Sequence, residues 1–340
     1  MKPDESRGLL SGRWFLSCDW GTSALRLRLV DAATLVIAAE TQASDGIGVT
    51  FNAWTASEGS GGSRWNFYRA VIRRHLAEIE RLSGRSLAGI PLVMSGMASS
   101  SIGCREVPYK KMPFMIDGSD LRVEILDRTE DFPHAVVLIS GACTNRDVMR
   151  GEETQLVGAL AGMDAVPGRQ LLVFPGTHSK HIIVENGEVS DFRTYMTGEF
   201  FGLLSRKSVL ATSVESSGGF DVPGYAEAFS EGVRDGAGGN LLHTCFRVRV
   251  RTLVESVEKT ANYHYLSGLI IGAEVNELRS TDAAITLVGS GSLAARYQLA
   301  FCILGIDVAR DTLDADSALL RGQWTMASHP RLTQTNSQCP

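Results

Sequence analysis

A short glycine turn near the start of the chain combines a carboxylate with small hydroxyl residues. Asp19 ends an apolar run and is followed by Trp20, Gly21, Thr22 and Ser23. A carboxylate at a strand end can hold Mg²⁺ through water, because magnesium keeps much of its hydration shell. The Gly-Thr-Ser segment would let backbone N–H groups and hydroxyls approach phosphate oxygens. The turn predicts a phosphate site with Asp19 as metal ligand, and a tight hairpin with a solvated carboxylate is the structural alternative.

Two further turns of this type occur later in the chain. The second consists of Gly176, Thr177, His178, Ser179 and Lys180, and the third of Gly289, Ser290 and Gly291. Lys180 adds a positive charge suited to a polyphosphate. The third turn follows an apolar run and leads into a helical pattern, an arrangement that brings backbone N–H groups to a phosphate. Each turn alone could be an exposed polar loop, but the three together predict nucleotide binding.

Apolar patterns indicate the elements that would position these turns. Each of the first two turns joins an apolar run to a second extended run, which predicts a β-hairpin. The expected strands are 14–18, 25–30, 35–40, 91–94, 135–139, 171–174, 181–184 and 285–288, and the expected helices are 68–82, 152–160, 200–210, 224–242, 254–269 and 293–304. Residues 45–48 are expected to form a loop. The repeated glycine-threonine hairpin indicates a duplicated domain.

Length and composition narrow the class of protein. A chain of 340 residues predicts two domains. The net charge of −5 argues against a nucleic-acid or anionic-membrane partner, which would need clustered positive charge. The six cysteines are scattered without metal-site spacing, and the first residues lack a secretory pattern. We therefore expect a cytoplasmic protein whose partners are small molecules, with no nucleic acid and no membrane.

The order of these features resembles the superfold shared by sugar kinases, heat-shock chaperone ATPases and actin. The more specific similarity is to the 2-keto-3-deoxygalactonokinase (2-dehydro-3-deoxygalactonokinase) family. The stretches that carry it are 19–23, 95–97, 106–109, 150–156, 174–180 and 197–201. The resemblance implies an α/β fold of two actin-like (ribonuclease H-like) domains, with mixed sheets flanked by helices and an interdomain cleft. The expected domains are 1–133 and 134–310, followed by a C-terminal helix and polar tail at 311–340.

The resemblance also implies an activity. It is the transfer of the γ-phosphoryl group of ATP, with Mg²⁺, to the 6-hydroxyl of 2-keto-3-deoxygalactonate, a step of galactonate catabolism. Phosphoryl transfer is mostly positioning and charge stabilisation, so it needs little covalent chemistry from the protein. We expect the turns at 19–23 and 176–180 to face one another and hold the same triphosphate. A homodimer is left open.

A carboxylate near the acceptor hydroxyl would orient it and take its proton. Related sugar kinases place an acidic residue at a helix start just before the second hairpin. Asp147, Glu152 and Glu153 compete for this role. We place Glu152 first and Asp147 as its rival, with capping of the helix N-terminus as the structural alternative.

The resemblance places the sugar acid at the loop 95–109, whose candidate contacts are Ser95, Gly96, Met97, Glu106 and Tyr109. The family carries an arginine and then a tryptophan around Gly103, where this chain has Ser101 and Cys104. An arginine would bind the substrate carboxylate bidentately, and serine cannot. Candidate replacements are Arg193, Arg105, Lys110 and Lys111, each of which could also be a solvated surface charge.

Three other functions remain open at this stage. A kinase of the same superfold could act on another sugar or 2-keto-3-deoxy acid, as the changes at Ser101 and Cys104 allow. A second alternative is a non-catalytic actin-like or chaperone-like nucleotide switch, although no additional partner-binding domain is apparent. A third is a ligand-sensing regulator, which no helix-turn-helix or basic patch supports.

Overall fold

The chain divides into two compact units. The computed structural model describes residues 12–57, 63–161, 168–216, 218–220, 222, 224–308 and 311–329, so the tail expected beyond His329 lies outside the described residues. Unit 1 comprises Met1–Ala165, Gly187–Ser190 and Ala315–Pro340, and unit 2 comprises Val166–Asn186 and Asp191–Asp314. The expected domain boundaries after residues 133 and 310 stay predictions. None of the described helices is both long and apolar enough to cross a membrane.

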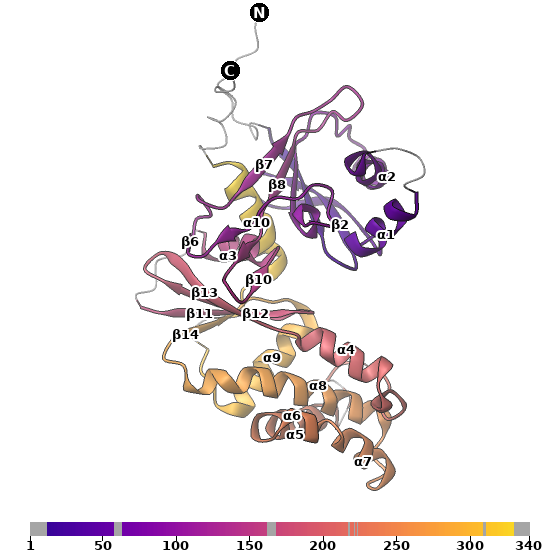
Figure 1. The fold of residues 1–340 in the computed structure, drawn as a ribbon, viewed down its shortest axis with the longest axis vertical. Helices are drawn as coiled ribbons and strands as arrows, with labels where there is room; N and C mark the ends of the chain where they lie inside the picture. The colour runs from indigo at the N-terminus through magenta and orange to yellow at the C-terminus, as the bar shows by residue number, and fades with distance from the viewer. Residues whose placement is uncertain are drawn as a thin grey trace, which may run out of the picture. The chain divides into compact units, whose positions relative to one another are not determined.

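Unit 1 is built on a mixed six-stranded sheet of order β3-β2-β1-β4-β8-β7 (Figure 1). Its strands are β1 (Trp14–Trp20), β2 (Leu25–Asp31), β3 (Ile37–Ala43), β4 (Leu92–Gly96), β7 (Val123–Leu126) and β8 (Val136–Ile139). The first three strands are antiparallel, whereas β1, β4 and β8 run parallel and end at the same edge. Very short strands follow at β5 (Lys110–Lys111), β6 (Phe114–Met115), β9 (Ala142–Cys143) and β10 (Val148–Met149). The parallel strand ends are where α/β sheets present ligand loops.

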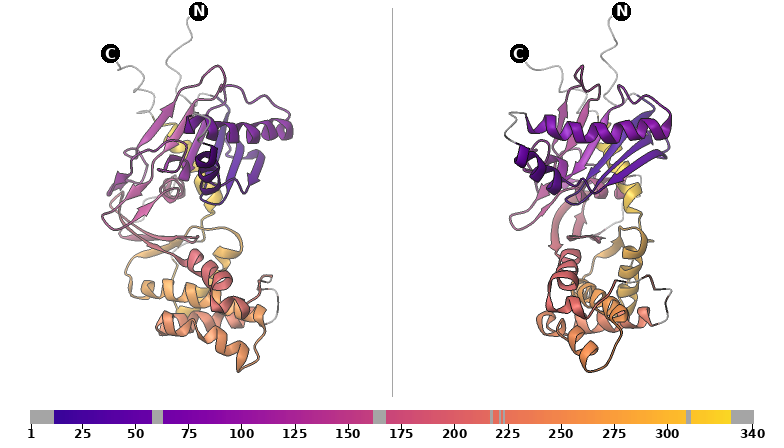
Figure 2. Two further views of the ribbon diagram at one scale, coloured as in Figure 1. Left: turned by 45° about the vertical axis from the view of Figure 1, so that its right-hand side comes forward. Right: turned by 90° about the vertical axis from the view of Figure 1, so that its right-hand side faces the viewer.

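Helices cover both faces of this sheet (Figures 1 and 2). They are α1 (Ile47–Ser57), α2 (Arg64–Ser83), α3 (Glu152–Leu160) and α10 (Ala315–Ala327). Because side chains alternate along a strand, Leu16 and Cys18 of β1 pack into the core beneath α2, whereas Phe15 faces Trp324 of α10 at 5.4 Å between ring centroids. Asp19 shares the α10 face, since it has the same parity as Phe15.

Unit 2 contains most of a five-stranded sheet of order β14-β11-β12-β13-β6, with β11 antiparallel to β12 and parallel to β14. Its strands are β11 (Gln170–Phe174), β12 (Ser179–Glu185), β13 (Glu188–Tyr195), whose first three residues belong to unit 1, and β14 (Ala284–Leu287). Its helices are α4 (Thr197–Lys207), α5 (Tyr225–Gly238), α6 (Leu241–Thr244), α7 (Arg247–Leu253), α8 (Lys259–Val275) and α9 (Gly291–Leu304). Apolar side chains of β11 and β14 form one core with α5, α8 and α9.

Most of the expected elements are present, and three expectations are wrong in detail. The loop expected at 45–48 becomes the start of α1 at Ile47. The helix expected at 224–242 ends at Gly238, because Gly239 is extended, and α6 follows separately. The helix expected from residue 254 begins at Lys259, because Ser256 adopts a left-handed φ of 57° that a helix cannot contain.

Candidate active site

Two glycines bring the start of α3 to the end of β1 in unit 1. In the sheet register, Asp19 lies opposite Arg26 of β2 and Ser95 of β4. Gly96 has a φ of 77°, and a Cβ there would lie 3.5 Å from Asp19 Oδ1. Gly151 has a φ of 117°, and its Cβ would lie 3.5 Å from Gly96 Cα. The structure therefore gathers Asp19, Gly96 and the acidic N-terminus of α3 at one edge of the sheet.

The two glutamates at the start of α3 have different environments. Glu153 is fully buried, and its two oxygens accept from the Gly151 N–H at 2.7 and 3.0 Å. Burial, and then the charge of Glu152, raise the pKa of Glu153 to about 7. Glu152 is half-buried and accepts from the Arg150 N–H at 3.2 Å. Glu153 is thus a buried cap, whereas the Glu152 carboxylate remains partly accessible.

Charged side chains surround Asp19. Burial raises the pKa of its carboxyl, the charges of Arg26 and Arg28 oppose this, and those of Asp316 and Glu152 add to it. Asp316 of α10 accepts from Arg26 at 2.6 Å and from Arg28 at 2.9 Å. Sequence reasoning did not include Arg26 in the site. Its position across the hairpin from Asp19, on the same face, was the signal that could have identified it.

The tip of the first hairpin packs against the start of α1. The N–H of Ile47 donates to the carbonyl of Gly21 at 2.9 Å. A Cβ on Gly46 would lie only 2.3 Å from the Thr22 carbonyl oxygen, so the backbones touch there. The side chains of Thr22 and Ser23 are exposed. The hydroxyls expected to meet phosphate are therefore on the accessible side of the tip.

Arg150 organises the loop expected to hold the sugar acid, a role that sequence reasoning missed. Its Nη1 donates to the Ser99 carbonyl at 2.7 Å and to the Ser99 hydroxyl oxygen at 2.6 Å. Both Nη atoms reach the Val107 carbonyl, at 3.5 and 3.4 Å. The guanidinium also lies 4.1 Å from the centre of the Tyr109 ring. One side chain therefore links both ends of this loop to the residue before Gly151.

The remaining candidates of this loop differ in accessibility. Ser95 is buried, and its hydroxyl accepts from Gln323 Nε2 at 2.9 Å. Met97 is half-buried and Glu106 is exposed. Ser95 is therefore held in the core by α10, whereas Glu106 is open to a ligand.

Most basic candidates for the substrate carboxylate are already paired. The pairs are Arg105 with Glu124, Lys110 with Asp120 at 2.7 Å, and, in unit 2, Arg193 with Glu277 at 2.9 Å. Lys111 is exposed and makes no ion pair with any residue that the structure describes. Arg64 of α2 was not considered from the sequence, yet its Nη1 donates to the Ser101 carbonyl at 2.6 Å.

The second hairpin tip belongs to unit 2. Thr177 and His178 are exposed, whereas Ser179 and Lys180 are buried. The Lys180 ammonium donates to the His178 carbonyl at 2.8 Å, so it turns back onto its own loop. His178 Nε2 lies 2.5 Å from Glu199 Oε2. The accessible part of this tip is therefore Gly176 to His178.

The third glycine turn lies beside the second. A Cβ on Gly289 would lie 3.6 Å from Cδ of Pro175, the residue before Gly176. Ser290 donates to Asp314 at 2.7 Å, and Gly291 starts α9 with a φ of 61°. The structure thus brings the Gly176 and Gly289 turns together in unit 2.

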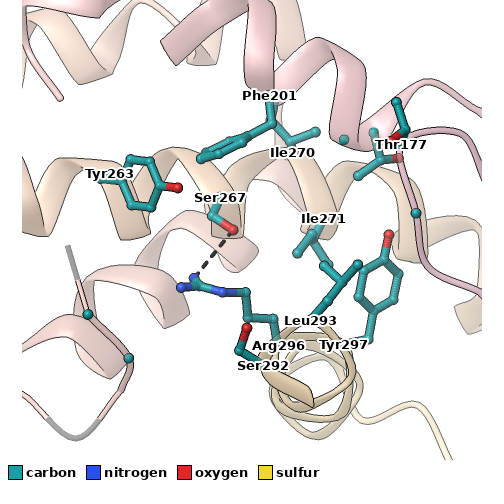
Figure 3. A pocket seen from close by; sticks show the side chains of 15 residues that line it. Thr177, Phe201, Tyr263, Ser267, Ile270, Ile271, Ser292, Leu293, Arg296 and Tyr297 are labelled. Atoms are coloured by element: carbon teal, nitrogen blue, oxygen red, sulfur yellow. Dashed lines mark hydrogen bonds between the residues drawn. The ribbon is translucent and has the colours of Figure 1, made fainter. Parts of the chain in front are cut away.

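A pocket of about 650 Å³ opens next to these turns (Figure 3). It is lined by the apolar side chains of Phe201, Ile270, Ile271 and Leu293 and by Gly176, Thr177, Gly198, Ser292, Tyr263, Ser267, Arg296 and Tyr297. Its volume lies within the usual range of small-ligand sites, roughly 300–1,000 Å³. Sequence reasoning placed the phosphate turns but not this pocket, because its apolar walls come from helices α4, α8 and α9.

Arg296 supplies a cationic plane in this pocket (Figure 3). Its Nη1 donates to Ser267 Oγ at 3.4 Å and to His264 Nδ1 at 3.2 Å. Burial and then the charge of Arg296 lower the pKa of His264 to about 4, so the imidazole is neutral near pH 7. An arginine plane and an aromatic ring, Tyr263, between apolar walls suit a flat heteroaromatic base.

The unit 1 site has the donors that Mg²⁺ prefers. No group of three or more His, Cys, Asp or Glu gathers as a metal cage in the part of the chain that the structure describes. Asp19, with Glu152 within electrostatic reach, offers hard carboxylate oxygens. Mg²⁺ commonly binds through one or two carboxylates together with water and substrate phosphates. Asp19 therefore fits the expected metal role.

The chain has mixed sheets flanked by helices, glycine turns at the strand ends and a pocket of small-ligand size, and the family that it matches is one of sugar-acid kinases. The model of the 2-keto-3-deoxy-galactonokinase family matches residues 19–326. The chain belongs to this family, as the sequence motifs indicated, and a kinase of this family uses ATP.

Named relatives agree with this assignment. The chain is 34% identical over 257 residues to 2-dehydro-3-deoxygalactonokinase of Escherichia coli (strain K12). The alignment covers 69% of this chain and 83% of the relative. It is 30% identical over 321 residues to the "Probable 2-dehydro-3-deoxygalactonokinase DgoK1" of Rhizobium meliloti (strain 1021), covering 91% and 95%. A crystal structure of a candidate 2-dehydro-3-deoxygalactonokinase from Sinorhizobium meliloti matches with a TM-score of 0.73 at 28% identity, covering 92% of this chain and 95% of that one.

Proposed function

We propose that the chain transfers the γ-phosphoryl group of ATP to the 6-hydroxyl of 2-keto-3-deoxygalactonate, a step of galactonate catabolism in the cytoplasm. The observation that carries this proposal is the family match over residues 19–326. That range includes both the Asp19 strand end of unit 1 and the Arg296 pocket of unit 2. The relatives named for this reaction support the same acceptor.

The nucleotide is proposed to use residues of both units. Adenine would enter the unit 2 pocket against Arg296, with its phosphates at the Gly176–Thr177 tip. The N–H groups and hydroxyls of Thr22 and Ser23 would contact the same triphosphate from unit 1. Asp19 would hold Mg²⁺ through water, and the ion when bound neutralises charge on the transferring phosphate oxygens.

Glu152 is proposed to orient the acceptor hydroxyl and take its proton while the hydroxyl oxygen attacks the γ-phosphorus and ADP leaves. Its partly exposed carboxylate lies within electrostatic reach of Asp19, which supports this role. Asp147 remains the rival. It is half-buried in a turn where its N–H donates to Thr144 Oγ1 at 2.9 Å.

The carboxylate of the sugar acid needs a basic partner in this chain. Lys111 and Arg64 support that role best, because Lys111 is exposed without an ion pair among the described residues and Arg64 reaches the Ser101 carbonyl. The Cys104 side chain is buried, with its thiol donating to the Ala98 carbonyl at 3.2 Å, so it packs inside the loop. Arg150 would hold Tyr109 and the loop in place.

A coupled ADP-release assay with Mg-ATP tests the proposal. The acceptor panel contains 2-keto-3-deoxygalactonate, its 2-keto-3-deoxygluconate epimer, galactonate and neutral hexoses. We expect turnover with 2-keto-3-deoxygalactonate at a kcat/KM at least about tenfold above the others. Turnover restricted to a neutral hexose would contradict the sugar-acid assignment. Preference for another 2-keto-3-deoxy acid would favour a second candidate function, a kinase of that acid. The presence of Ser101 and Cys104, where the family carries arginine and tryptophan, supports this second candidate.

The same assay with Glu152→Gln and Asp147→Asn assigns the base. We expect Glu152→Gln to lower kcat by about 10²–10⁴-fold while Mg-ATP still binds, because general base catalysis typically contributes this much. Asp147→Asn should change kcat far less. The reverse pattern would transfer the role to Asp147.

A further inference from the structure

A buried hydrogen-bond network connects the pocket of unit 2 to the second hairpin tip. We infer that Glu274 is a positioning residue that, through Tyr297 and Ser179, sets the conformation of the Gly176–Thr177 tip for the phosphates of ATP. This inference rests on the proposed function, because it assigns a role within the proposed nucleotide site.

Glu274 lies on α8 with only 4% of its surface exposed. Its Oε1 accepts from His181 Nε2 of β12 at 2.9 Å, and its Oε2 accepts from the Tyr297 hydroxyl of α9 at 2.6 Å. The Thr197 hydroxyl at the start of α4 also donates to Oε2. One carboxyl group therefore joins four elements, with three donors on its two oxygens.

The direction of the next hydrogen bond follows from the proton count. A tyrosine hydroxyl has a single proton, and that of Tyr297 is donated to Glu274. The hydroxyl of Ser179, 2.9 Å from the Tyr297 oxygen, must therefore be the donor between these two. Ser179 then has only lone pairs left, and the Gly176 N–H donates to it at 3.4 Å.

The network reaches the tip by a second route. A Cβ on Gly198 would lie 2.6 Å from the Gly176 carbonyl oxygen and 2.8 Å from Thr177 Cα. The Glu199 N–H donates to the Thr177 carbonyl at 3.0 Å. Since Thr197 is bonded to Glu274, the start of α4 and Ser179 hold the tip from two sides.

This assigns different roles to residues that looked equivalent in the sequence. Ser179 is fully buried with its proton committed to Tyr297, so it would act on the phosphates only through the loop. Thr177 and His178 are exposed, and their N–H groups and the Thr177 hydroxyl remain for direct contact.

Binding of two probes by the full chain tests the inference. The variants are Tyr297→Phe, which keeps the ring in the pocket wall, Ser179→Ala, their combination, and Glu274→Gln. The probes are a non-hydrolysable ATP analogue with Mg²⁺ and adenosine, both measured by calorimetry. Each single variant should bind the ATP analogue about tenfold more weakly, the loss expected for one hydrogen bond, and bind adenosine within about twofold of wild type.

The double variant distinguishes a connected network from independent effects. If Tyr297 and Ser179 act in one chain, their combination should remain near tenfold rather than reach about a hundredfold. Additive losses, equal weakening of adenosine, or wild-type affinity of Tyr297→Phe for the analogue would each overturn the inference.

Tyr265→Phe is the matched control. Tyr265 is a buried tyrosine on α8, the helix that also carries Glu274. Its hydroxyl donates to Asp235 Oδ2 at 2.6 Å, outside the network. We expect a lower Tm with unchanged affinity for both probes, whereas a selective loss of analogue binding in this control would contradict the inference. A wild type that binds neither probe would refute the proposed function itself.

Discussion

Glu153 is a buried carboxyl whose protonation is coupled to folding. Its pKa is raised from 4.5 to about 7, by burial first and then by the charge of Glu152. Between these two values the folded chain keeps a proton that the unfolded chain has released. The free energy of unfolding must therefore fall as pH rises through this window. Above about pH 7 the stabilisation by the bound proton is fully lost.

Glu153→Gln is predicted to remove this pH dependence, because the amide cannot ionise and can still accept from the Gly151 N–H. Relative to wild type, the variant should gain up to roughly 3 kcal/mol of unfolding free energy between pH 4.5 and 8. Denaturant unfolding of both proteins at several pH values measures this difference. A difference that is the same at pH 4.5 and pH 8 would contradict the prediction.

At the scale of elements, the crossing of α3 and α10 controls where the acidic helix start lies. A Cβ on Gly158 would lie 1.8 Å from the Ala318 carbonyl oxygen, and one on Gly322 would lie 1.9 Å from the Thr154 carbonyl oxygen. The two helix backbones therefore touch, with no room for side chains. Because α3 begins at Glu152, any separation of these helices would also move the acidic helix start.

Gly158→Ala is predicted to destabilise the fold by about 1–3 kcal/mol or more, because the methyl group must push α10 away. Turnover should also fall, since Glu152 moves with α3. Gly238→Ala is the matched control at the end of α5, where a Cβ meets nothing within 4 Å. Denaturant midpoints and kcat of the two variants test this, and an equal effect of both substitutions would contradict it.

The elements also show how far local pattern can reach. The two glycine hairpins and α2, which is capped by Gly84 with a φ of 63°, follow from alternation, helical spacing and a cap within a few residues. The two-residue strands β5, β9 and β10 carry too little pattern to be detected. Such strands exist because of tertiary pairing, not local preference.

The same limit separates the site residues that were anticipated from those that were missed. Asp19 and the Gly176 turn stand in recognisable local motifs. The role of Arg150 depends on Ser99, and that of Glu274 on Ser179 and His181, which are some 50 to 95 residues away in sequence. Lys180 has the positive charge that a phosphate site needs. Its hydrogen bond to the His178 carbonyl depends on the folded conformation of the loop, which the sequence pattern does not show.

At the scale of the whole molecule, each unit carries one part of the proposed machinery. Unit 1 has the Asp19 strand end, the acidic start of α3 and the loop held by Arg150. Unit 2 has the Gly176 tip, the Gly289 turn and the pocket with Arg296. The central claim of the proposed function is that one Mg-ATP binds residues of both units.

Hydrogen–deuterium exchange during a titration with Mg-ATP tests this claim most directly. The account predicts slower amide exchange in both 19–23 and 176–180, with the same midpoint concentration, because a single ligand orders both tips. Protection of only one of these segments, or two clearly different midpoints, would contradict it.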